Sequence, residues 1–173
     1  MTYRILVAYA SKYGATAEIA RKIGDVLTTA GLKVNVLDVE KVTDVTPFDA
    51  VVLGSAVYGG NWRSEAVKFL EDYKTPLEHI PIWLFSSGPM GEGDPVALAQ
   101  WWHFPSAQQP IADRIHARDI ALFHGVLDLS KLNFVEKTIV KDFNAPAGDF
   151  RDWEAITNWA ISIAVSLRPE VGE

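Results

Sequence analysis

The 173-residue chain contains no cysteine, which excludes disulfide bonds, iron–sulfur clusters, thiolate zinc sites and cysteine nucleophiles. Its four histidines, His79, His103, His116 and His124, also lack the close spacing that metal ligands usually have. We therefore expect neither a metal site nor thiol chemistry. The lack of disulfides, together with the lack of an export signal in the first residues, predicts a cytoplasmic location.

Long apolar runs are missing as well, although 49% of the residues are hydrophobic. No run reaches the roughly 18 uninterrupted apolar residues that a membrane-spanning helix needs. We therefore expect no transmembrane segment, while a peripheral contact with a membrane surface stays open.

Basic residues are scarcer than acidic ones, with 16 Lys and Arg against 22 Asp and Glu and a formal net charge of −6. Binding to nucleic acid depends on Lys and Arg contacts to phosphates, so we expect no nucleic-acid partner. A chain of this length buries roughly 70% of its unfolded surface, which is enough for one core. We find no repeat and no linker, and we predict a single domain over residues 1–173.

Apolar patterns along the chain predict alternating strands and helices. We expect strands at 5–9, 33–39, 48–53, 80–85 and 119–123. Helices are expected after the first, third, fourth and fifth of these strands. Alternation of buried strands with helices predicts an α/β fold with a five-stranded parallel sheet in the order 2-1-3-4-5 and helices on both faces.

Local signals predict the ends of two helices. Ser64 is of a residue type that favours the N-cap position, and the helix after it is expected to reach about Tyr73. The final helix opens at Asp149 or Asp152, both of which suit an N-cap. Its 3.6-residue period places Trp153 on the core face.

A polar loop at residues 11–16 joins the first strand to the first helix. The hydroxyls of Ser11 and Thr16 and the loop N–H groups gather at the helix N-terminus, where unpaired donors and the helix dipole attract a phosphate. The loop lacks the final Lys-Ser/Thr of a nucleoside-triphosphate loop, and it is not G-x-G-x-x-G. It therefore predicts a site for one terminal phosphate without Mg²⁺. Lys12 either offsets the phosphate charge or is solvated.

Three loops meet at the carboxyl ends of the predicted strands, where ligands of such sheets bind. They span residues 11–16, 54–62 and 86–91, and their small residues suit a flat ligand edged by backbone amides. Tyr58 and Trp62 either stack on that ligand or are rim aromatics in a turn. The candidate binding residues are Ser11, Lys12, Tyr13, Gly14, Ala15, Thr16, Ala56, Val57, Tyr58, Gly59, Gly60, Trp62, Ser86, Ser87, Gly88, Pro89 and Met90.

Several motifs resemble those of one family. The loop Ser-Lys-Tyr-Gly-Ala-Thr at 11–16 resembles the phosphate loop of the flavodoxins, which bind FMN. The stretches S-A-V-Y-G-G-N-W-R-S, L-F-S-S-G-P and R-D-W-E-A-I resemble the flavodoxin-domain family that includes the menaquinone-dependent protoporphyrinogen dehydrogenases. The resemblance implies a flavodoxin-like three-layer sandwich, FMN as cofactor, and oxidation of a substrate on the haem pathway with a quinone as acceptor.

The same resemblance gives Gly59-Gly60 a second interpretation. In flavodoxins a peptide of this loop can rotate so that its carbonyl accepts the N5–H of the reduced flavin, and glycine tolerates such a rotation. An ordinary Gly-Gly turn is the alternative.

The family also inserts a segment after the last strand, and residues 127–148 occupy that place here. Between 128 and 142 three acids balance three bases, which gives little attraction to anionic lipid. We expect the insert to help form the acceptor site beside the flavin. The cluster Trp101-Trp102-His103-Phe104-Pro105 covers the flavin, meets a quinone or partner, or fills a gap beneath a surface loop.

Two functions agree with these features. The first is a flavoenzyme with a quinone-like acceptor, and it is favoured because the acidic bias around the predicted site is weak. The second is a flavodoxin-type electron carrier that docks on a redox-partner protein. No acid–base set occurs in the three site loops, so the cofactor is expected to carry the chemistry and no catalytic side chain is predicted.

Overall fold

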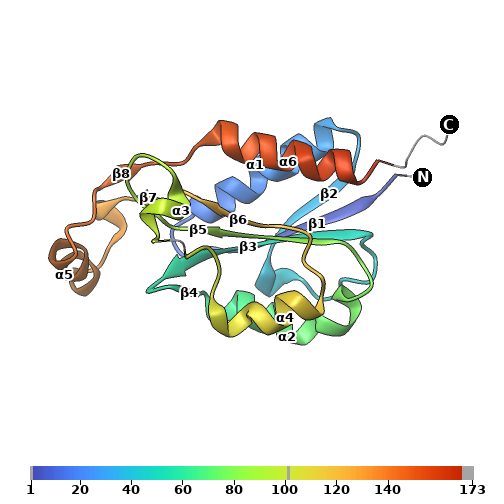
Figure 1. Cartoon of the computed structure of the whole chain (residues 1–173), viewed down its shortest axis with the longest axis horizontal. Coiled ribbons are helices and arrows are strands. Elements are labelled where there is room, and N and C mark those ends of the chain that lie inside the picture. Colours follow the sequence, from blue (N-terminus) through green and yellow to red (C-terminus); the bar gives the residue numbers. More distant parts are fainter. Residues whose placement is uncertain (1, 101, 169–173) are drawn as a thin grey trace.

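A computed structural model describes residues 2–100 and 102–168, and its centre is a parallel sheet (Figure 1). The strand order is β2-β1-β3-β5-β6, and the small strand β4 pairs antiparallel with β3. With β4 set aside, this is the predicted order 2-1-3-4-5. The bounds are β1 Arg4–Ala10, β2 Lys33–Asp38, β3 Ala50–Tyr58, β4 Asn61–Trp62, β5 Ile82–Ser87 and β6 Ile120–Phe123.

Helices cover both faces of the sheet and make three layers (Figure 1). One face carries α1 and α6, and the other carries α2 and α4. The helix bounds are α1 Ala15–Thr29, α2 Ser64–Leu77, α3 Pro95–Leu98, α4 Gln109–Arg114, α5 Phe134–Asp142 and α6 Trp153–Ser166. Short 3₁₀ turns lie at Val39–Lys41 (η1), Ser106–Gln108 (η2) and Leu129–Lys131 (η3).

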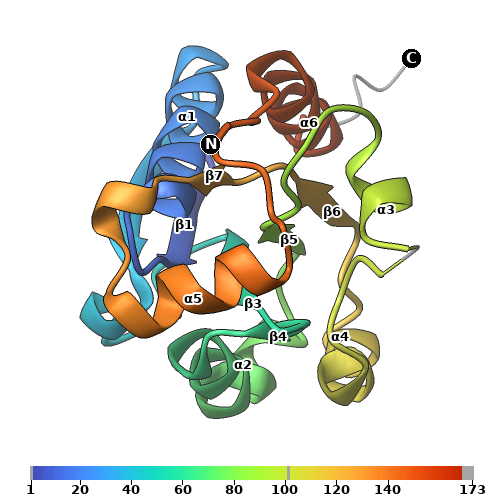
Figure 2. The ribbon, with the colours of Figure 1, turned by 90° about the vertical axis from the view of Figure 1, so that its left-hand side faces the viewer.

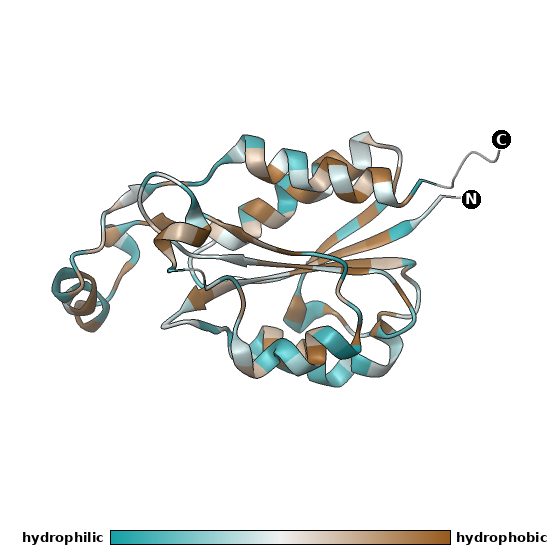
Figure 3. Cartoon of the chain, in the orientation of Figure 1, coloured by the Kyte–Doolittle hydropathy of each residue, from teal (hydrophilic) through white to brown (hydrophobic). Residues whose placement is uncertain are grey.

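Alternate side chains of each central strand enter different cores. In β1, Ile5 and Val7 pack toward α1 and α6, while Leu6 and Ala8 pack toward α2 and α4. All four are fully buried. Successive side chains of a strand point to opposite faces, so a strand covered on both faces must be apolar throughout. Figure 3 shows this apolar character along the strands.

Two strands run further than the sequence predicts. β3 continues to Tyr58, so Ala56 and Val57 lie on a strand and not in a loop. β5 includes Ser86 and Ser87, which pair with residues of β3. Small and polar residues at the strand ends look like loop residues in the sequence, but the parallel ladder continues through their backbone groups.

Helix ends differ in part from the prediction. Ser64 is the first residue of α2, not its cap, and the helix runs past Tyr73 to Leu77 with Pro76 in its last turn. At the start of α6 the Asp152 carboxylate accepts a hydrogen bond from the Ala155 N–H at 3.0 Å, which decides between the two predicted openings. Trp153 is exposed and does not enter the core.

The insert projects from the carboxyl ends of the strands. Strands β7 Val126–Leu127 and β8 Gly148–Asp149 pair at its base, where Leu127 faces Gly148. Figure 2 shows α5, the orange helix, crossing in front of the ends of the central strands. None of the helices in the described part of the chain is long and apolar enough to cross a membrane.

Candidate functional site

A cavity of about 990 Å³ lies between the carboxyl ends of the central strands and the insert. All three predicted loops contribute to its lining. The predicted residues that line it are Ser11, Lys12, Tyr13, Gly14, Ala15, Thr16, Ala56, Val57, Tyr58, Gly59, Ser87, Gly88 and Met90. Its size suits a cofactor or a drug-sized ligand. Across residues 2–100 and 102–168, no group of three or more Asp, Glu, Cys or His side chains could hold a metal ion.

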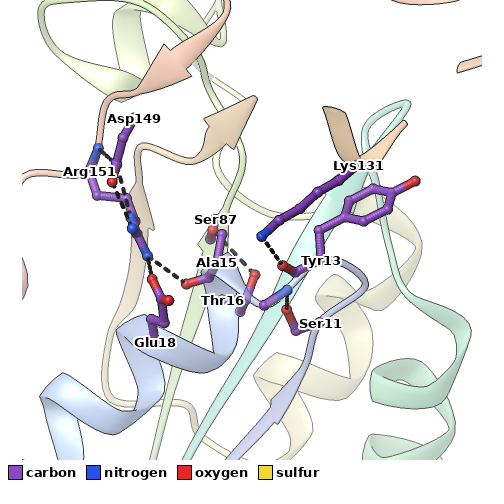
Figure 4. Close-up of polar contacts among 10 residues, drawn as sticks. Ser11, Tyr13, Ala15, Thr16, Glu18, Ser87, Lys131, Asp149 and Arg151 are labelled. Carbon is purple, nitrogen blue, oxygen red and sulfur yellow. Dashed lines mark hydrogen bonds and ion pairs between the residues drawn. The ribbon is translucent and has the colours of Figure 1, made fainter. Parts of the chain in front are cut away.

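One end of the cavity is rich in hydrogen-bond donors (Figure 4). The Ser11 hydroxyl accepts the Gly14 N–H at 3.0 Å, and the buried Thr16 hydroxyl lies 3.4 Å from that of Ser87. Gly14 occupies the N-cap of α1 with a left-handed φ of 95°. Because glycine has no side chain, the first N–H groups of α1 are not capped by it and face the loop. These donors and the helix dipole fit a phosphate monoester.

Lys12 is tied to the insert. Its ammonium lies 2.8 Å from the Glu136 carboxylate, which also accepts a hydrogen bond from the Tyr13 hydroxyl. The hydrogen bond with Glu136 is the main cause that raises the pKa of Lys12, and the same contact lowers the pKa of Glu136. The ammonium also lies over the rings of Tyr13 and Tyr58, at 5.1 and 6.0 Å from their centroids. Lys12 is therefore not simply solvated.

The two predicted stacking aromatics have different positions. Tyr58 is 47% exposed and lines the cavity, and partial burial raises its pKa. Trp62 is 5% exposed and belongs to the core on the α2 face. Its indole N–H donates to the Ser86 hydroxyl at 2.8 Å, and its ring meets Phe104 edge to face. The stacking role predicted for Trp62 is therefore wrong, and Ser86 supports Trp62 without lining the cavity.

The short β3–β4 hairpin explains the position of Trp62. Gly59 and Gly60 have φ values of 58° and 77°, as a two-residue hairpin turn requires. The chain reverses so sharply that Trp62 pairs with Val57, and the Trp62 side chain is buried. The Gly59 carbonyl accepts the Asn61 side-chain N–H at 3.2 Å and Gly59 lines the cavity, whereas Gly60 lies at the hairpin tip, outside that lining. The peptide rotation stays a prediction.

Pro89 has a supporting position behind the cavity. Its carbonyl accepts the Gly125 N–H at 3.0 Å and lies 3.1 Å from Nδ1 of His124. The other ring nitrogen of His124 lies 2.6 Å from the Gly93 carbonyl. This buried histidine therefore ties the end of β6 to the loop after β5 and has a structural role.

The insert forms the wall that faces the three loops. Its apolar contribution consists of Leu127, Leu132, Ile139, Val140, Phe143 and Ala145. In addition, the Lys131 ammonium donates to the Tyr13 carbonyl at 3.3 Å (Figure 4). Sequence reasoning placed the insert near the flavin but missed these side chains, because nothing local indicates a contact between residues 118 positions apart.

Arg151 is a second missed residue, although it stands in the R-D-W-E-A-I motif. Its guanidinium pairs with Asp149 at 2.7 Å and with Glu18, and it donates to the Ala15 carbonyl at 3.3 Å. The hydrogen bonds with Asp149 and Glu18 raise the pKa of Arg151, and the pKa of Asp149 is lowered in turn. Arg151 therefore fastens the end of the insert to the first turn of α1 (Figure 4). Its guanidinium carbon also lies 4.6 Å from the centroid of the exposed Trp153 ring.

The aromatic cluster after β5 is only partly assigned. Phe104 is buried against Trp62, in agreement with the gap-filling alternative. Trp101 lies outside the described residues.

Comparison with known proteins agrees with this architecture. The chain is similar to a protoporphyrinogen IX dehydrogenase [quinone] of Escherichia coli (strain K12), at 22% identity over 93% of this chain and 94% of the relative. It shares its fold with a flavodoxin from the domain Archaea, with a TM-score of 0.60 and 17% identity over 94% of this chain and 97% of that one. Oxidised flavodoxin 1 from Bacillus cereus gives a TM-score of 0.61 and 14% identity over 96% and 99%.

The family itself follows from a match that spans most of the chain. A family model described as a flavodoxin domain matches residues 6–153, from β1 into the first turn of α6. The matched range contains the donor-rich loop, the hairpin and the insert. The chain therefore belongs to the flavodoxin domain family.

Proposed function

We propose that the protein binds FMN and acts as a flavoenzyme that passes electrons to a quinone-class acceptor. The observation that carries this proposal is the joining, in one cavity, of a phosphate-type donor set to an apolar wall from the insert. Ser11, Thr16 and the first N–H groups of α1 would hold the phosphate. Bound FMN would supply the two-electron chemistry.

The residues around the rest of the cavity suit a flat ring system. Tyr58 offers an aromatic face, and Ser87, Gly88 and Met90 contribute to the lining of the same cavity. Removing water from around the ring would be the task of the insert, because α5 covers the open side of the cavity.

The apolar wall supports an acceptor of low polarity. Leu132, Ile139, Val140 and Phe143 face the same cavity as Met90 of the opposite loop. Burial of an aromatic, weakly polar ligand such as a quinone against a surface of this kind is favourable. The printed name of the E. coli relative, which includes a quinone, supports the same class. A porphyrinogen donor on the haem pathway is the corresponding proposal for the reducing substrate.

The net charge of −6 favours a second candidate, an electron carrier. An acidic surface steers a protein toward basic partners, as docking between redox proteins requires. Such a carrier needs no small-molecule acceptor site.

Steady-state kinetics separate the two candidates. FMN-loaded protein would be assayed anaerobically with protoporphyrinogen or NADPH as donor and menadione as acceptor. The flavoenzyme predicts turnover that saturates with menadione concentration. Slow menadione reduction that rises linearly with concentration and never saturates would favour the carrier.

A further inference from the structure

We propose that Lys131 of the insert is a ligand of the cofactor phosphate, so that binding of the phosphate fastens the insert over the site. This inference rests on the proposed binding of FMN. It extends the phosphate site beyond the loop before α1 to a residue more than a hundred positions further along the chain.

The insert contacts two consecutive residues of the phosphate loop. Lys131 donates to the Tyr13 carbonyl at 3.3 Å, and Glu136 accepts hydrogen bonds from Lys12 and from the Tyr13 hydroxyl. Figure 4 shows the Lys131 side chain directed at the loop, near Ser11 and Thr16. All of these residues line the same cavity. Lys131 thus reaches the loop whose donors fit a phosphate.

The other cations of the cavity are matched with carboxylates. Lys12 pairs with Glu136, Arg63 pairs with Glu65 at 2.9 Å, and Arg151 pairs with Asp149 and Glu18. Lys131 instead donates to a backbone carbonyl. The nearby Asp128 carboxylate accepts hydrogen bonds from the N–H and the hydroxyl of Ser130. The ammonium of Lys131 therefore keeps a charge and two further N–H donors for a ligand.

A phosphate monoester carries more negative charge than a helix N-terminus offsets. Its charge at pH 7 is roughly −1.5 to −2, whereas a helix N-terminus contributes the equivalent of roughly +0.5. Lysine binds phosphate as a compact charge with several donors. Lys131 would add one full charge from the side opposite to α1.

A consequence is coupling between the phosphate and the insert. If Lys131 contacts the phosphate, then FMN holds η3 and α5 in place more strongly than riboflavin, which has the same ring and no phosphate. By linkage, the insert then strengthens FMN binding by the same factor.

Binding measurements on Lys131→Met test the proposal, with Lys137→Met as the matched control because Lys137 is an exposed lysine of the same insert. Dissociation constants for FMN and riboflavin would come from quenching of flavin fluorescence. Loss of one exposed charge-assisted contact should weaken FMN binding by Lys131→Met roughly five- to thirty-fold. Riboflavin binding should change less than about twofold, and Lys131→Arg should restore much of the FMN affinity.

Three results would overturn the assignment. Equal FMN affinities of Lys131→Met and Lys137→Met would remove Lys131 from the phosphate site. Equal losses for FMN and riboflavin would mean that Lys131 acts only through the structure of the insert. If the wild-type protein binds no FMN, the proposed function fails and this inference fails with it.

Hydrogen exchange provides a readout that does not depend on affinity. Amides of residues 129–143 should exchange more slowly in wild-type protein saturated with FMN than in protein saturated with riboflavin. Lys131→Met should abolish the difference between the two ligands. Equal exchange of the wild-type insert with both ligands would contradict the coupling.

Discussion

At the scale of single residues, two hydroxyls from distant parts of the chain meet at the donor-rich end of the cavity. Thr16 lies in the first turn of α1 and Ser87 ends β5, yet their oxygens lie 3.4 Å apart. Both side chains are almost fully buried. A buried hydroxyl is costly unless it is hydrogen-bonded, so this pair is suited to a polar ligand that supplies further partners.

Thr16→Val should weaken FMN binding about ten- to a hundred-fold, because a lost hydrogen bond to a charged group costs about 1.5–3 kcal/mol. Riboflavin binding should barely change. Thr28→Val is the matched control, since Thr28 lies on the same helix and its hydroxyl donates to the Gly24 carbonyl, far from the loop. Fluorescence titration of both variants with both flavins would measure the effect, and equal losses for FMN and riboflavin would show that Thr16 does not hold the phosphate.

At the scale of elements, β3 and β5 pack closely in the middle of the sheet. Gly54 lies in the middle of β3, and a Cβ built there would come within 1.9 Å of the Phe85 ring. Phe85 is itself fully buried and packs against Phe123 and Trp159. The ring therefore has little room to move.

Gly54→Ala should lower the free energy of unfolding by about 3 kcal/mol, at the upper end for overpacking a core. Chemical denaturation would measure the change. Adding Phe85→Leu to Gly54→Ala should recover part of the loss, because the smaller side chain makes room for the methyl group. Strictly additive losses in the double variant would mean that the two positions do not clash.

The attachment of α5 to the phosphate loop should depend on pH. The Lys12 contact lowers the pKa of Glu136, so the ion pair is complete above the ordinary range of a glutamate and is lost as the pH falls through the lowered pKa. Because the chain has no cysteine, spin labels can be placed specifically at Thr138→Cys on α5 and Lys68→Cys on α2. The distance distribution between them should be narrow at pH 7 and broaden in acid.

Glu136→Gln is the control for this experiment, with Glu154→Gln on α6 as a matched change outside the insert. The first variant should show the broad distribution already at pH 7, and the second should behave as wild type. Circular dichroism at each pH would establish that the fold is retained. A wild-type distribution that stays narrow in acid while the fold persists would contradict the role given to Glu136.

The elements themselves were largely predictable from the sequence, and their ends were not. Apolar runs such as the one in β1 identify buried strands, because only a strand covered on both faces is apolar at every position. The end of β3 was not predicted because Gly54 and Ser55 resemble loop residues, and Ser86 and Ser87 had the same effect at the end of β5. Trp62 was misplaced because an aromatic residue beside a Gly-Gly turn can point to either side. Nothing in the sequence around Lys131 or Glu136 predicts their contacts with the loop at residues 11–16.

At the scale of the whole molecule, the cavity exists only where the central sheet and the insert meet. The three loops supply one wall, and η3 and α5 supply the other. The β7–β8 pair closes the insert below this wall. Both parts are thus needed for the proposed acceptor site, whereas the sheet and its four covering helices have cores of their own.

Replacing residues 129–143 with a short Gly-Ser connection should preserve the fold, since the β7–β8 pair lies outside the deleted part. Turnover with menadione should fall by orders of magnitude, because the acceptor is no longer positioned. FMN affinity should fall about as far as in Lys131→Met, while riboflavin affinity changes little. Saturable turnover that survives the replacement would exclude the insert from the acceptor site.

The most direct test of the account is a titration of the purified protein with FMN, FAD and riboflavin, followed by flavin fluorescence. The donor-rich end of the cavity is formed by one helix N-terminus and a few hydroxyls, which suits a single phosphate monoester. We predict binding of FMN near one equivalent, weaker binding of riboflavin, and discrimination against FAD. Flavin fluorescence that stays unchanged with FMN, or equal affinities for all three flavins, would contradict the central claim.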